Sequence, residues 1–393
     1  MNSAAPTWRV VLACGGTGGH LFPGLAVADE LSHRGANVTL VISPKEVDQQ
    51  GIRAVAGRFE VITLPVVAFS LRRTMEFGTT LWQAHRHLRD RFAQQPPDAV
   101  LAMGGFLSAT PILAGRRAGA LTFLHESNTI PGRANRWLAR LATECFVGLK
   151  ETVTRLSNRN VSVTGTPVRA EIRRAITSEA RRALGLAEDR PVILITGGSQ
   201  GALGVNRLVL AALPEVASAH PDLQWVHLTG TADFPEVDAT YRRAGIPALV
   251  RPFSPQMDLM LAAATVAVAR SGASFLAELA ARRLPAVLVP YPAATDDHQR
   301  HNAEAVVRAG AALMLQQHTA DGPQLAAKLD ELLRDSARRT AMATALEKLD
   351  APLAAADIAD RIWRRLDERA AGRFPQNSAA SAAHSPSVAA RAA

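Results

Sequence analysis

Short apolar runs rich in Val, Ile and Leu alternate with longer segments of helical periodicity along the first half of the chain. The runs are WRVVLA (8–13), NVTLVI (37–42), DAVLAM (98–103) and ALTFLH (120–125). Apolar runs of this length are typical of strands covered on both faces, and helical segments between them indicate β-α-β units. The pattern predicts a parallel sheet with helices on both sides.

The second half of the chain repeats this pattern. Its apolar runs are PVILIT (191–196), LQWVHL (223–228), ATVAVA (264–269) and PAVLVP (285–290). A glycine-rich turn follows the first run of each half, GGTGG at 15–19 and GGSQG at 197–201. The chain of 393 residues is also longer than one hydrophobic core usually supports. We therefore predict an α/β protein of two related, doubly wound domains that face each other across a cleft.

The domain boundary is expected in the stretch VTGTPVRAEIRR, where a turn with Gly165 and Pro167 precedes a basic helix. This places the first domain at 1–166 and the second at 167–350. The segment 351–371 has helical periodicity, and we expect it to pack back onto the first domain. Residues 374–393 are rich in Ala, Ser and Pro without apolar periodicity, which predicts a disordered tail.

The composition is that of a globular protein, with 48% hydrophobic and 20% charged residues. Cys14 and Cys145 are the only cysteines and both lie in apolar runs, which argues against a disulfide framework or a thiolate metal site and suits a reducing cytosol. The start of the chain lacks the pattern of a secretory signal. The longest apolar run, 259–269, is too short to span a bilayer.

The formal charge of +9 is concentrated in the first half. Residues 1–166 hold 18 Lys and Arg against 11 Asp and Glu, an excess of +7. Such an excess suits nucleic acid, an anionic membrane surface or a phosphorylated ligand, or it simply keeps the protein soluble. The positions of the arginines decide among these.

The first glycine loop, CGGTGGHLFPG (14–24), lies between a predicted strand and a predicted helix. Backbone amides of such a loop can approach an anion closely, and phosphate is the natural ligand. The loop matches neither a P-loop nor G-x-G-x-x-G, because Leu21 stands in place of the third glycine. His20 can accept a proton from a hydroxyl nucleophile near neutral pH, or it can serve only in capping or packing.

A third stretch, RSGASFLAEL from Arg270, starts a helix with Glu278 one turn inside it. A carboxylate there is well placed to accept hydrogen bonds from the vicinal hydroxyls of a ribose. The next polar loop, ATDDHQRHNA (294–303), contains Asp296 and Asp297. Adjacent carboxylates without a third ligand indicate a solvated turn, so we assign no metal.

Taken together, these stretches resemble one family. They are GGTGGHLFPGLAVADEL, MGGFLSATPILAGRRAG, LHESNTIPGRANRWLARLA, GTPVR, GGSQGALGVN, RSGAS followed by AEL, and VPYPAATDDHQRHNA. In this order, over residues 8 to about 350, the chain resembles the MurG family of bacterial enzymes. These enzymes transfer N-acetylglucosamine (GlcNAc) from UDP-GlcNAc to undecaprenyl-pyrophosphoryl-N-acetylmuramyl-pentapeptide (lipid I), which forms lipid II for peptidoglycan.

The resemblance implies the GT-B architecture of two Rossmann-like domains, with UDP-GlcNAc held mainly by the second and lipid I by the first. No cofactor or metal is implied, since UDP-GlcNAc is a substrate. His20 is the candidate catalytic base. The positions that match the family's donor-binding residues are Thr17, Gly18, Gly19, Asn128, Arg169, Ser199, Ser254, Ala273, Ser274, Phe275, Leu276, Ala277, Glu278 and Gln299.

The implied reaction is a single displacement that inverts the anomeric centre. The C4 hydroxyl of the muramyl sugar loses a proton as it attacks, and Arg169, Ser199 and the helix start near residue 273 stabilise the leaving UDP. One position departs from the family, because Phe275 stands where a threonine usually helps to bind the diphosphate. The loss of that hydrogen bond costs about 1.5 to 3 kcal/mol unless Ser274 or backbone amides compensate.

A basic and apolar segment at 69–92 explains the charge of the first half. Part of its helical stripe must be core, and a solvated surface helix remains the alternative. Large apolar side chains beside arginines favour anionic lipid over nucleic acid, and a lipid-borne acceptor makes such a patch reasonable. We predict a peripheral protein on the cytoplasmic face of the cell membrane, with other cell-wall synthesis proteins as candidate partners. The predicted membrane patch consists of Phe69, Leu71, Arg72, Arg73, Met75, Phe77, Leu81, Trp82, Arg86 and Arg89.

Three other functions share some features with this sequence. Another GT-B transferase that forms a glycolipid shares the loops and differs in the sugar contacts. A catalytically weak UDP-sugar-binding partner of cell-wall enzymes has only Phe275 in its favour. A nicotinamide-dependent oxidoreductase is disfavoured, because its glycine fingerprint and ribose carboxylate are not met.

Overall fold

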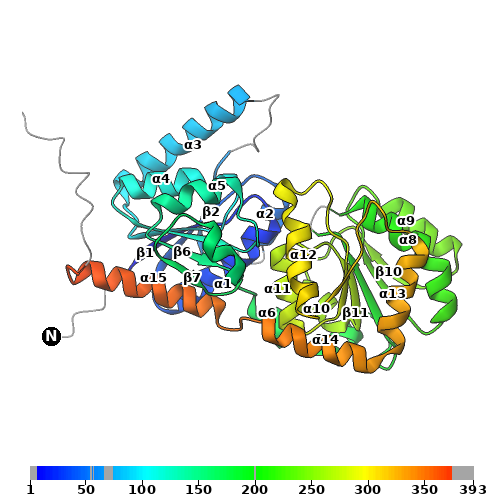
Figure 1. The fold of residues 1–393 in the computed structure, drawn as a ribbon. Helices are drawn as coiled ribbons and strands as arrows, with labels where there is room; N and C mark the ends of the chain where they lie inside the picture. Colours follow the sequence, from blue (N-terminus) through cyan, green and yellow to red (C-terminus); the bar gives the residue numbers. More distant parts are fainter. Residues whose placement is uncertain (1–6, 54, 56, 66–73, 199–200, 374–393) are drawn as a thin grey trace, which may run out of the picture.

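The computed structural model describes residues 7–53, 55, 57–65, 74–198 and 201–373, and these residues form two parallel α/β sheets (Figure 1). The first sheet has seven strands within the described residues, in the order β3-β2-β1-β4-β5-β6-β7. Every pairing in it is parallel. The strands are β1 (Arg9–Ala13), β2 (Asn37–Ile42), β3 (Glu60–Thr63), β4 (Ala99–Ala102), β5 (Leu121–Glu126), β6 (Glu144–Val147) and β7 (Val161–Val163).

The second sheet has six strands in the described part of the chain, in the order β10-β9-β8-β11-β12-β13. Its pairings are parallel as well. The strands are β8 (Val192–Thr196), β9 (Gln224–Leu228), β10 (Ala248–Arg251), β11 (Val266–Ala269), β12 (Ala286–Leu288) and β13 (Leu313–Met314). The predicted α/β class with two doubly wound sheets is therefore confirmed.

Helices cover both faces of each sheet, so that each sheet lies between two apolar clusters. In the first domain these elements are α1 (Gly18–His33), α2 (Glu46–Arg53), α3 (Thr74–Gln94), η2 (Phe106–Ser108), α4 (Ala109–Arg117), α5 (Arg133–Leu138), η3 (Ala139–Leu141) and η4 (Lys150–Arg155). In the second they are α6 (Ala170–Arg174), α7 (Thr177–Ala183), α8 (Leu203–Ala219), α9 (Phe234–Arg243), α10 (Met257–Ala263), α11 (Ala273–Arg282), η5 (Thr295–Asp297), α12 (His298–Arg308), α13 (Gly322–Arg334) and α14 (Ser336–Leu349).

The strand order reverses direction between β1 and β4 in the first sheet and between β8 and β11 in the second. In open α/β sheets, ligands bind beyond the carboxyl ends of the strands at such switch points. The loops that leave β1 and β4 carry the GGTGGH and MGGF stretches, and the loops that leave β8 and β11 carry GGSQG and RSGAS. The topology thus brings four of the stretches singled out in the sequence to two switch points.

The last helix, α15 (Ala354–Ala370), lies along the first domain, where Figure 1 shows it in orange-red. Its buried residues Ile358, Ile362 and Leu366 join the same apolar cluster as Trp8 and Phe123. The chain therefore passes between the domains twice, before α6 and before α15. The two passages touch at Gly165, which has a φ of +81° and where an added Cβ would lie 2.1 Å from the Cβ of Ala351.

All eight strands expected from apolar runs are present, with ends that differ by up to two residues. Five strands were not predicted, namely β3, β6, β7, β10 and β13. They are two to four residues long, and β3, β7 and β10 lack the fully buried pattern of the central strands. In β6 the first residue is Glu144, a charged group that is buried because arginines of α15 pair with it. A single sequence does not reveal that pairing.

Candidate active site

His20 lies in the first turn of α1, directly after the first glycine loop. Its Nδ1 is 3.2 Å from the Thr17 hydroxyl, a hydrogen bond whose donor depends on the imidazole tautomer. Two glycines after β4, Gly104 and Gly105, lie beside the imidazole ring and have φ values of +111° and +79°. A Cβ on Gly104 would lie 3.1 Å from His20 Nε2, and a Cβ on Gly105 would lie 3.0 Å from His20 Cε1. The glycines of MGGF thus give the ring its space.

The pKa of His20 is lowered, first because burial disfavours the imidazolium. The carboxylates of Glu126 and Asp48 act in the opposite direction, while Lys45 and His298 add to the lowering. The net direction keeps the imidazole neutral at neutral pH. A neutral imidazole is the form that accepts a proton, so the environment suits a general base.

One backbone amide of the first glycine loop donates a hydrogen bond to a carboxylate of this chain. Gly16 N donates to Asp48 Oδ2 over 2.6 Å, and the fully buried Asp48 also accepts hydrogen bonds from Ser43. The Gly16 amide therefore already has an anionic partner, and the expectation that this loop binds phosphate stays a prediction for its other amides. The reason is tertiary, since Asp48 comes from α2, 32 residues further along the chain.

Glu126, at the end of β5, organises the ESN stretch. This buried carboxylate accepts hydrogen bonds from the backbone and side-chain amides of Asn128, both at 2.9 Å, from Gly132 N at 2.9 Å and from Asn135 Nδ2 at 2.8 Å. The sequence interpretation gave a role to Asn128 and none to Glu126. The available signal was its position, a charged residue at the carboxyl end of an apolar strand.

Asn302 of α12 joins the two domains and was not among the sequence-predicted residues. It is fully buried, and its Oδ1 accepts hydrogen bonds from Thr129 N and Thr129 Oγ1 at 2.9 and 3.0 Å. Its Nδ2 donates to Asn128 Oδ1 and to the carbonyl of Ser271. Four hydrogen bonds on one side chain therefore connect the ESN loop to the start of α11.

The helix start that carries RSGAS also meets the first glycine loop. A Cβ on Gly19 would lie 3.8 Å from Ser274 Oγ, so α1 and α11 touch across the domain boundary. Arg169, which precedes α6, places its guanidinium over the ring of Phe22 in α1, 4.2 Å from the ring centroid. The arginine is largely buried, and its Nε has no partner among the described residues. Residues of both domains thus surround one region.

Glu278 is buried within α11, at 9% exposure. Burial raises its pKa to about 7, and the positive charge of Arg169 offsets part of that rise. A carboxylate in this state gains from hydrogen-bond donors, because they replace the water that it has lost. The vicinal hydroxyls of a ribose are donors of this kind.

The remaining predicted donor contacts lie in the second domain. Ser254 is buried in the loop after β10, where its hydroxyl accepts a hydrogen bond from Gln256 N. Gln299 lies in the first turn of α12, its Oε1 accepts from Tyr291 N, and its carbonyl accepts from Ser271 Oγ. Ser199 lies outside the described residues.

Comparison with known proteins agrees with this arrangement. Residues 10–147 match the glycosyltransferase family 28 N-terminal domain, and residues 192–362 match the C-terminal domain of that family. A protein of Anaeromyxobacter sp. (strain Fw109-5) is 36% identical over 90% of this chain and 92% of its own length. It is named UDP-N-acetylglucosamine–N-acetylmuramyl-(pentapeptide) pyrophosphoryl-undecaprenol N-acetylglucosamine transferase.

A protein of Pelobacter propionicus with the same name is 35% identical over 87% of this chain and 96% of its own length. The crystal structure of Acinetobacter baumannii MurG superposes with a TM-score of 0.69 at 26% identity, over 91% of this chain and all of that one. The chain belongs to the MurG family of N-acetylglucosamine transferases. The GT-B architecture inferred from the sequence is thereby confirmed.

Phe275 is the position at which this MurG-family chain departs from the threonine expected there. Its ring packs against the apolar cluster that contains Leu276 and Leu279. The preceding residue, Ser274, is the hydroxyl-bearing side chain that faces the first glycine loop. Phe275 is therefore partly buried against the core of the second domain, and the Ser274 hydroxyl faces Gly19.

The predicted membrane patch is only partly within the described residues. Phe69, Leu71, Arg72 and Arg73 lie outside them, and Met75 and Phe77 lie on α3. Leu81 packs against the core, whereas Trp82 is 62% exposed with the Arg86 guanidinium over its ring. Arg86 and Arg89 both pair with Asp90. The outer face of α3 thus combines an exposed tryptophan with arginines, and no helix of the described residues is long and apolar enough to cross a bilayer.

The two aspartates of the TDD turn each pair with arginine. Asp296 pairs with Arg133 and Arg136 of the first domain, and Asp297 pairs with Arg300 of its own helix. Both aspartates have φ values near +50°, a backbone conformation that non-glycine residues seldom adopt. No cluster of three or more potential metal ligands is found among the described residues.

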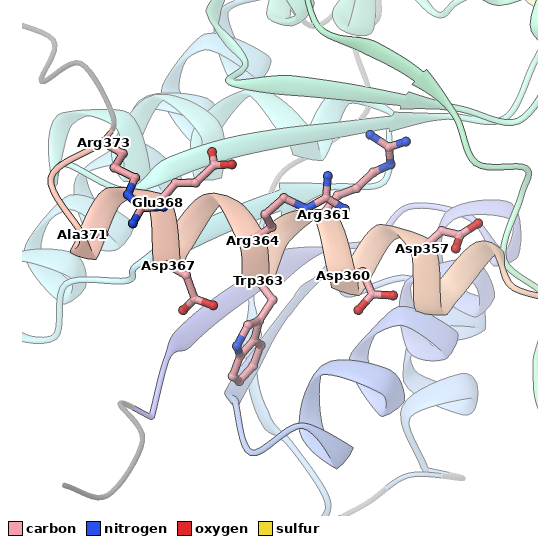
Figure 2. Close-up of a pocket in the computed structure, with 9 residues that line it drawn as sticks. All are labelled: Asp357, Asp360, Arg361, Trp363, Arg364, Asp367, Glu368, Ala371 and Arg373. Carbon is pink, nitrogen blue, oxygen red and sulfur yellow. The ribbon is translucent and has the colours of Figure 1, made fainter.

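A cavity of about 720 Å³ lies along α15 and shares no residue with the candidate active site (Figure 2). Its lining mixes acidic and basic side chains with one tryptophan, whose ring projects from the same side as two of the aspartates (Figure 2). The residues that line it are Asp357, Asp360, Arg361, Trp363, Arg364, Asp367, Glu368, Ala371 and Arg373. It contains none of the predicted site residues.

Proposed function

We propose that the protein transfers GlcNAc from UDP-GlcNAc to the C4 hydroxyl of the N-acetylmuramyl sugar of lipid I, with inversion at the anomeric carbon. The observation that carries this proposal is the contact between the two helix starts, where Gly19 of the His20 loop meets Ser274 of the Glu278 helix. A proton acceptor and a nucleotide-binding helix start are thereby held side by side.

Each end of the reaction has residues suited to it. Glu278 accepts hydrogen bonds from the ribose hydroxyls, and Gln299 Nε2 contacts the sugar. As the bond from the anomeric carbon to UDP breaks, negative charge grows on the diphosphate. The Arg169 guanidinium and the amides at the start of α11 stabilise that charge.

On the acceptor side, His20 takes the proton of the attacking hydroxyl. Its neutral state at neutral pH and the open glycine surface of Gly104 and Gly105 suit that role. The loop Thr17 to Gly19 lies between the base and the second domain, where it contacts the donor. The hydroxyl attacks from the face opposite UDP, which gives a β-linkage.

Turnover of UDP-GlcNAc with a soluble lipid I analogue tests this function. We expect a lipid II analogue from the wild type and a fall in kcat of about 10²- to 10⁴-fold in His20→Ala, the usual contribution of a general base. Full activity of His20→Ala would remove His20 from the mechanism. Product with UDP-galactose instead of UDP-GlcNAc would indicate a different glycolipid transferase, and binding without product would indicate a UDP-sugar-binding partner.

We further propose that the protein binds the cytoplasmic face of the cell membrane through α3 and the segment before it. The exposed Trp82 and the neighbouring Arg86 and Arg89 support this, because an indole and guanidinium groups both favour the interface of anionic lipid. We expect binding to vesicles that contain anionic phospholipid, weakened by salt.

Charge reversal distinguishes this patch from general attraction by a basic protein. Replacement of Arg72, Arg73, Arg86 and Arg89 by Glu is expected to abolish binding to anionic vesicles at low salt. The matched control reverses four exposed arginines of the second domain and should retain binding. Equal binding by both variants would rule out the patch. The control set is Arg182, Arg190, Arg242 and Arg283.

A further inference from the structure

Asp48 is a fully buried carboxylate that the reaction described above does not use. It lies in α2, and its Oδ2 accepts hydrogen bonds from Gly16 N, Ser43 N and Ser43 Oγ. Its Oδ1 is buried and has no hydrogen-bond partner within the part of the chain that the structure describes. A buried carboxylate costs free energy unless it is compensated, so three hydrogen bonds to one oxygen hold it where water does not reach.

The same loop is held from its other side by Lys45. The Lys45 Nζ donates to the carbonyl of Gly16 over 2.9 Å and lies 5.6 Å from the centroid of the Phe106 ring. Phe106 in turn lies next to Gly16, where an added Cβ would be 3.6 Å from its Cε1. The amide and the carbonyl of Gly16 are therefore both fixed, by an acid and a base that lie three residues apart in the sequence.

The helix α2 also fixes the residue that follows His20. The side chain of Leu21 is fully buried, and a Cβ on Gly51 would lie 2.4 Å from its Cδ2. α2 thus contacts the chain before the candidate base through Asp48 and after it through Gly51. Both contacts are independent of any ligand.

We propose that Asp48 is a positioning residue for the transfer reaction: it occupies the first glycine loop as an internal anion and holds the Thr17–His20 segment in its reactive geometry. The inference rests on the proposed function only in taking His20 as the base. An internal anion removes the need for the loop to be ordered by the diphosphate of a substrate.

Asp48 also acts on His20 through its charge. The charged or titratable groups that interact with His20 are Glu126 and His125 on β5, Asp48 on α2, Lys45 before α2 and His298 at the start of α12. The two acids favour the imidazolium, and Lys45 and His298 disfavour it. Neutralising Asp48 must therefore lower the pKa of His20 further, and neutralising Lys45 must raise it.

The test compares Asp48→Asn with Lys45→Met by histidine NMR and by kinetics. Asparagine keeps an oxygen where Gly16 N donates, so this variant removes the charge and preserves the acceptor. We expect the His20 titration, assigned from its absence in His20→Gln, to move down in Asp48→Asn and up in Lys45→Met. The acid limb of kcat/KM should move in the same two directions.

The loop contact is tested separately with Asp48→Val, which lacks the acceptor. We expect kcat to fall about 10- to 100-fold, as expected when a catalytic group is slightly misplaced, with the fold checked by circular dichroism. The matched control is Glu46→Gln, which makes the same charge change on the exposed side of the same helix and should leave titration and kcat unchanged.

Failure of this inference differs from failure of the proposed function. A wild type without turnover would refute the function, while the His20 titration still reports on Asp48. An active wild type with the same His20 titration and the same kcat in Asp48→Asn and Asp48→Val would overturn the inference. Shifts of the same sign in Asp48→Asn and Lys45→Met would overturn its electrostatic part.

Discussion

At the scale of single residues, the site contains acidic side chains that are buried away from water. Glu126 and Asp48 regain hydrogen bonds from backbone amides, and their partners are fixed within the first domain. Glu278 differs from both, because no donor within the described residues hydrogen-bonds to it and burial raises its pKa to about 7. The unmet hydrogen-bonding capacity of Glu278 is consistent with a group whose partner is a substrate.

Glu278→Gln is expected to stabilise the unliganded protein at high pH. In the folded state the pKa of Glu278 is raised from 4.5 to about 7, so its ionisation costs folding free energy that is absent below pH 4.5 and complete above pH 7. A shift of this size corresponds to roughly 3 kcal/mol. Urea unfolding should show the variant more stable than the wild type at pH 8 and equal to it at pH 4.5, while UDP-GlcNAc affinity falls. Equal stability at pH 8 would contradict this view.

Phe275→Thr tests how the residue usual in the family affects stability and the KM for UDP-GlcNAc in this chain. The ring of Phe275 packs against the core of the second domain, so its removal should destabilise that domain by about 1 to 3 kcal/mol in denaturant unfolding. Since Ser274 already presents a hydroxyl toward the first loop, we expect the KM for UDP-GlcNAc to change little. A large fall in that KM would show that Ser274 does not compensate. Ser274→Ala is the matched variant and should raise the KM.

At the scale of elements, glycine-rich loops at the switch points face each other, and short helices carry the residues that hold them. α15 is the element that returns the end of the chain to the first domain. It is held by buried apolar residues and by Glu144 of β6, which accepts hydrogen bonds from Arg361 and Arg365, each at 3.1 Å. The 3% exposure of the Glu144 side chain makes this the most enclosed of the ion pairs on α15.

Glu144→Gln is expected to loosen α15. Loss of hydrogen bonds to a charged and buried acceptor should cost about 1.5 to 3 kcal/mol in the unfolding free energy and should increase amide hydrogen exchange along α15. The control is Asp360→Asn, which breaks the more exposed pair with Arg34 and should have a much smaller effect. If both variants exchange alike, the buried acid is not what holds the helix.

At the scale of the whole molecule, buried hydrogen bonds and surface ion pairs of the described residues both connect the domains near the site. The amide of Asn302 is fully buried and makes four hydrogen bonds. The pairs of Asp296 with Arg133 and Arg136 are at the surface, with Arg133 77% exposed. The hydrogen bond from Arg133 and the charges of both arginines lower the pKa of Asp296, so the pairs persist at neutral pH.

Asn302→Ala should separate the domains more than Asp296→Asn does. Buried hydrogen bonds that lose a partner leave unsatisfied groups, whereas surface ion pairs are screened and contribute little. Distances between spin labels on the two domains should lengthen in Asn302→Ala at any salt concentration, and only at low salt in Asp296→Asn. Asp297→Asn is the control, since its pair with Arg300 lies within one domain. A larger effect of Asp296→Asn would reverse this ranking.

Whether the role of a site residue can be predicted depends on how far along the chain its partners lie. His20 and Glu278 can be predicted from the sequence because each lies at the start of a helix that follows an apolar run and a turn, and Gln299 is predicted only through the family resemblance. Asn302 and Asp48 are not, because their roles depend on partners 173 and 32 residues away in the chain. The donor-contact roles of the predicted residues stay predictions.

The amino-acid sequence alone determined the two parallel sheets, their glycine loops and the family to which the chain belongs. These follow from apolar runs and turn residues that act locally, since a strand covered on both faces must be apolar and a tight loop requires glycine. The tertiary structure alone decided which group fills the first loop, how Glu126 holds the ESN loop, how Asn302 connects the domains, and where Phe275 packs. Those outcomes depend on side chains that meet only after folding, when burial makes each unpaired polar group costly and so selects its partner.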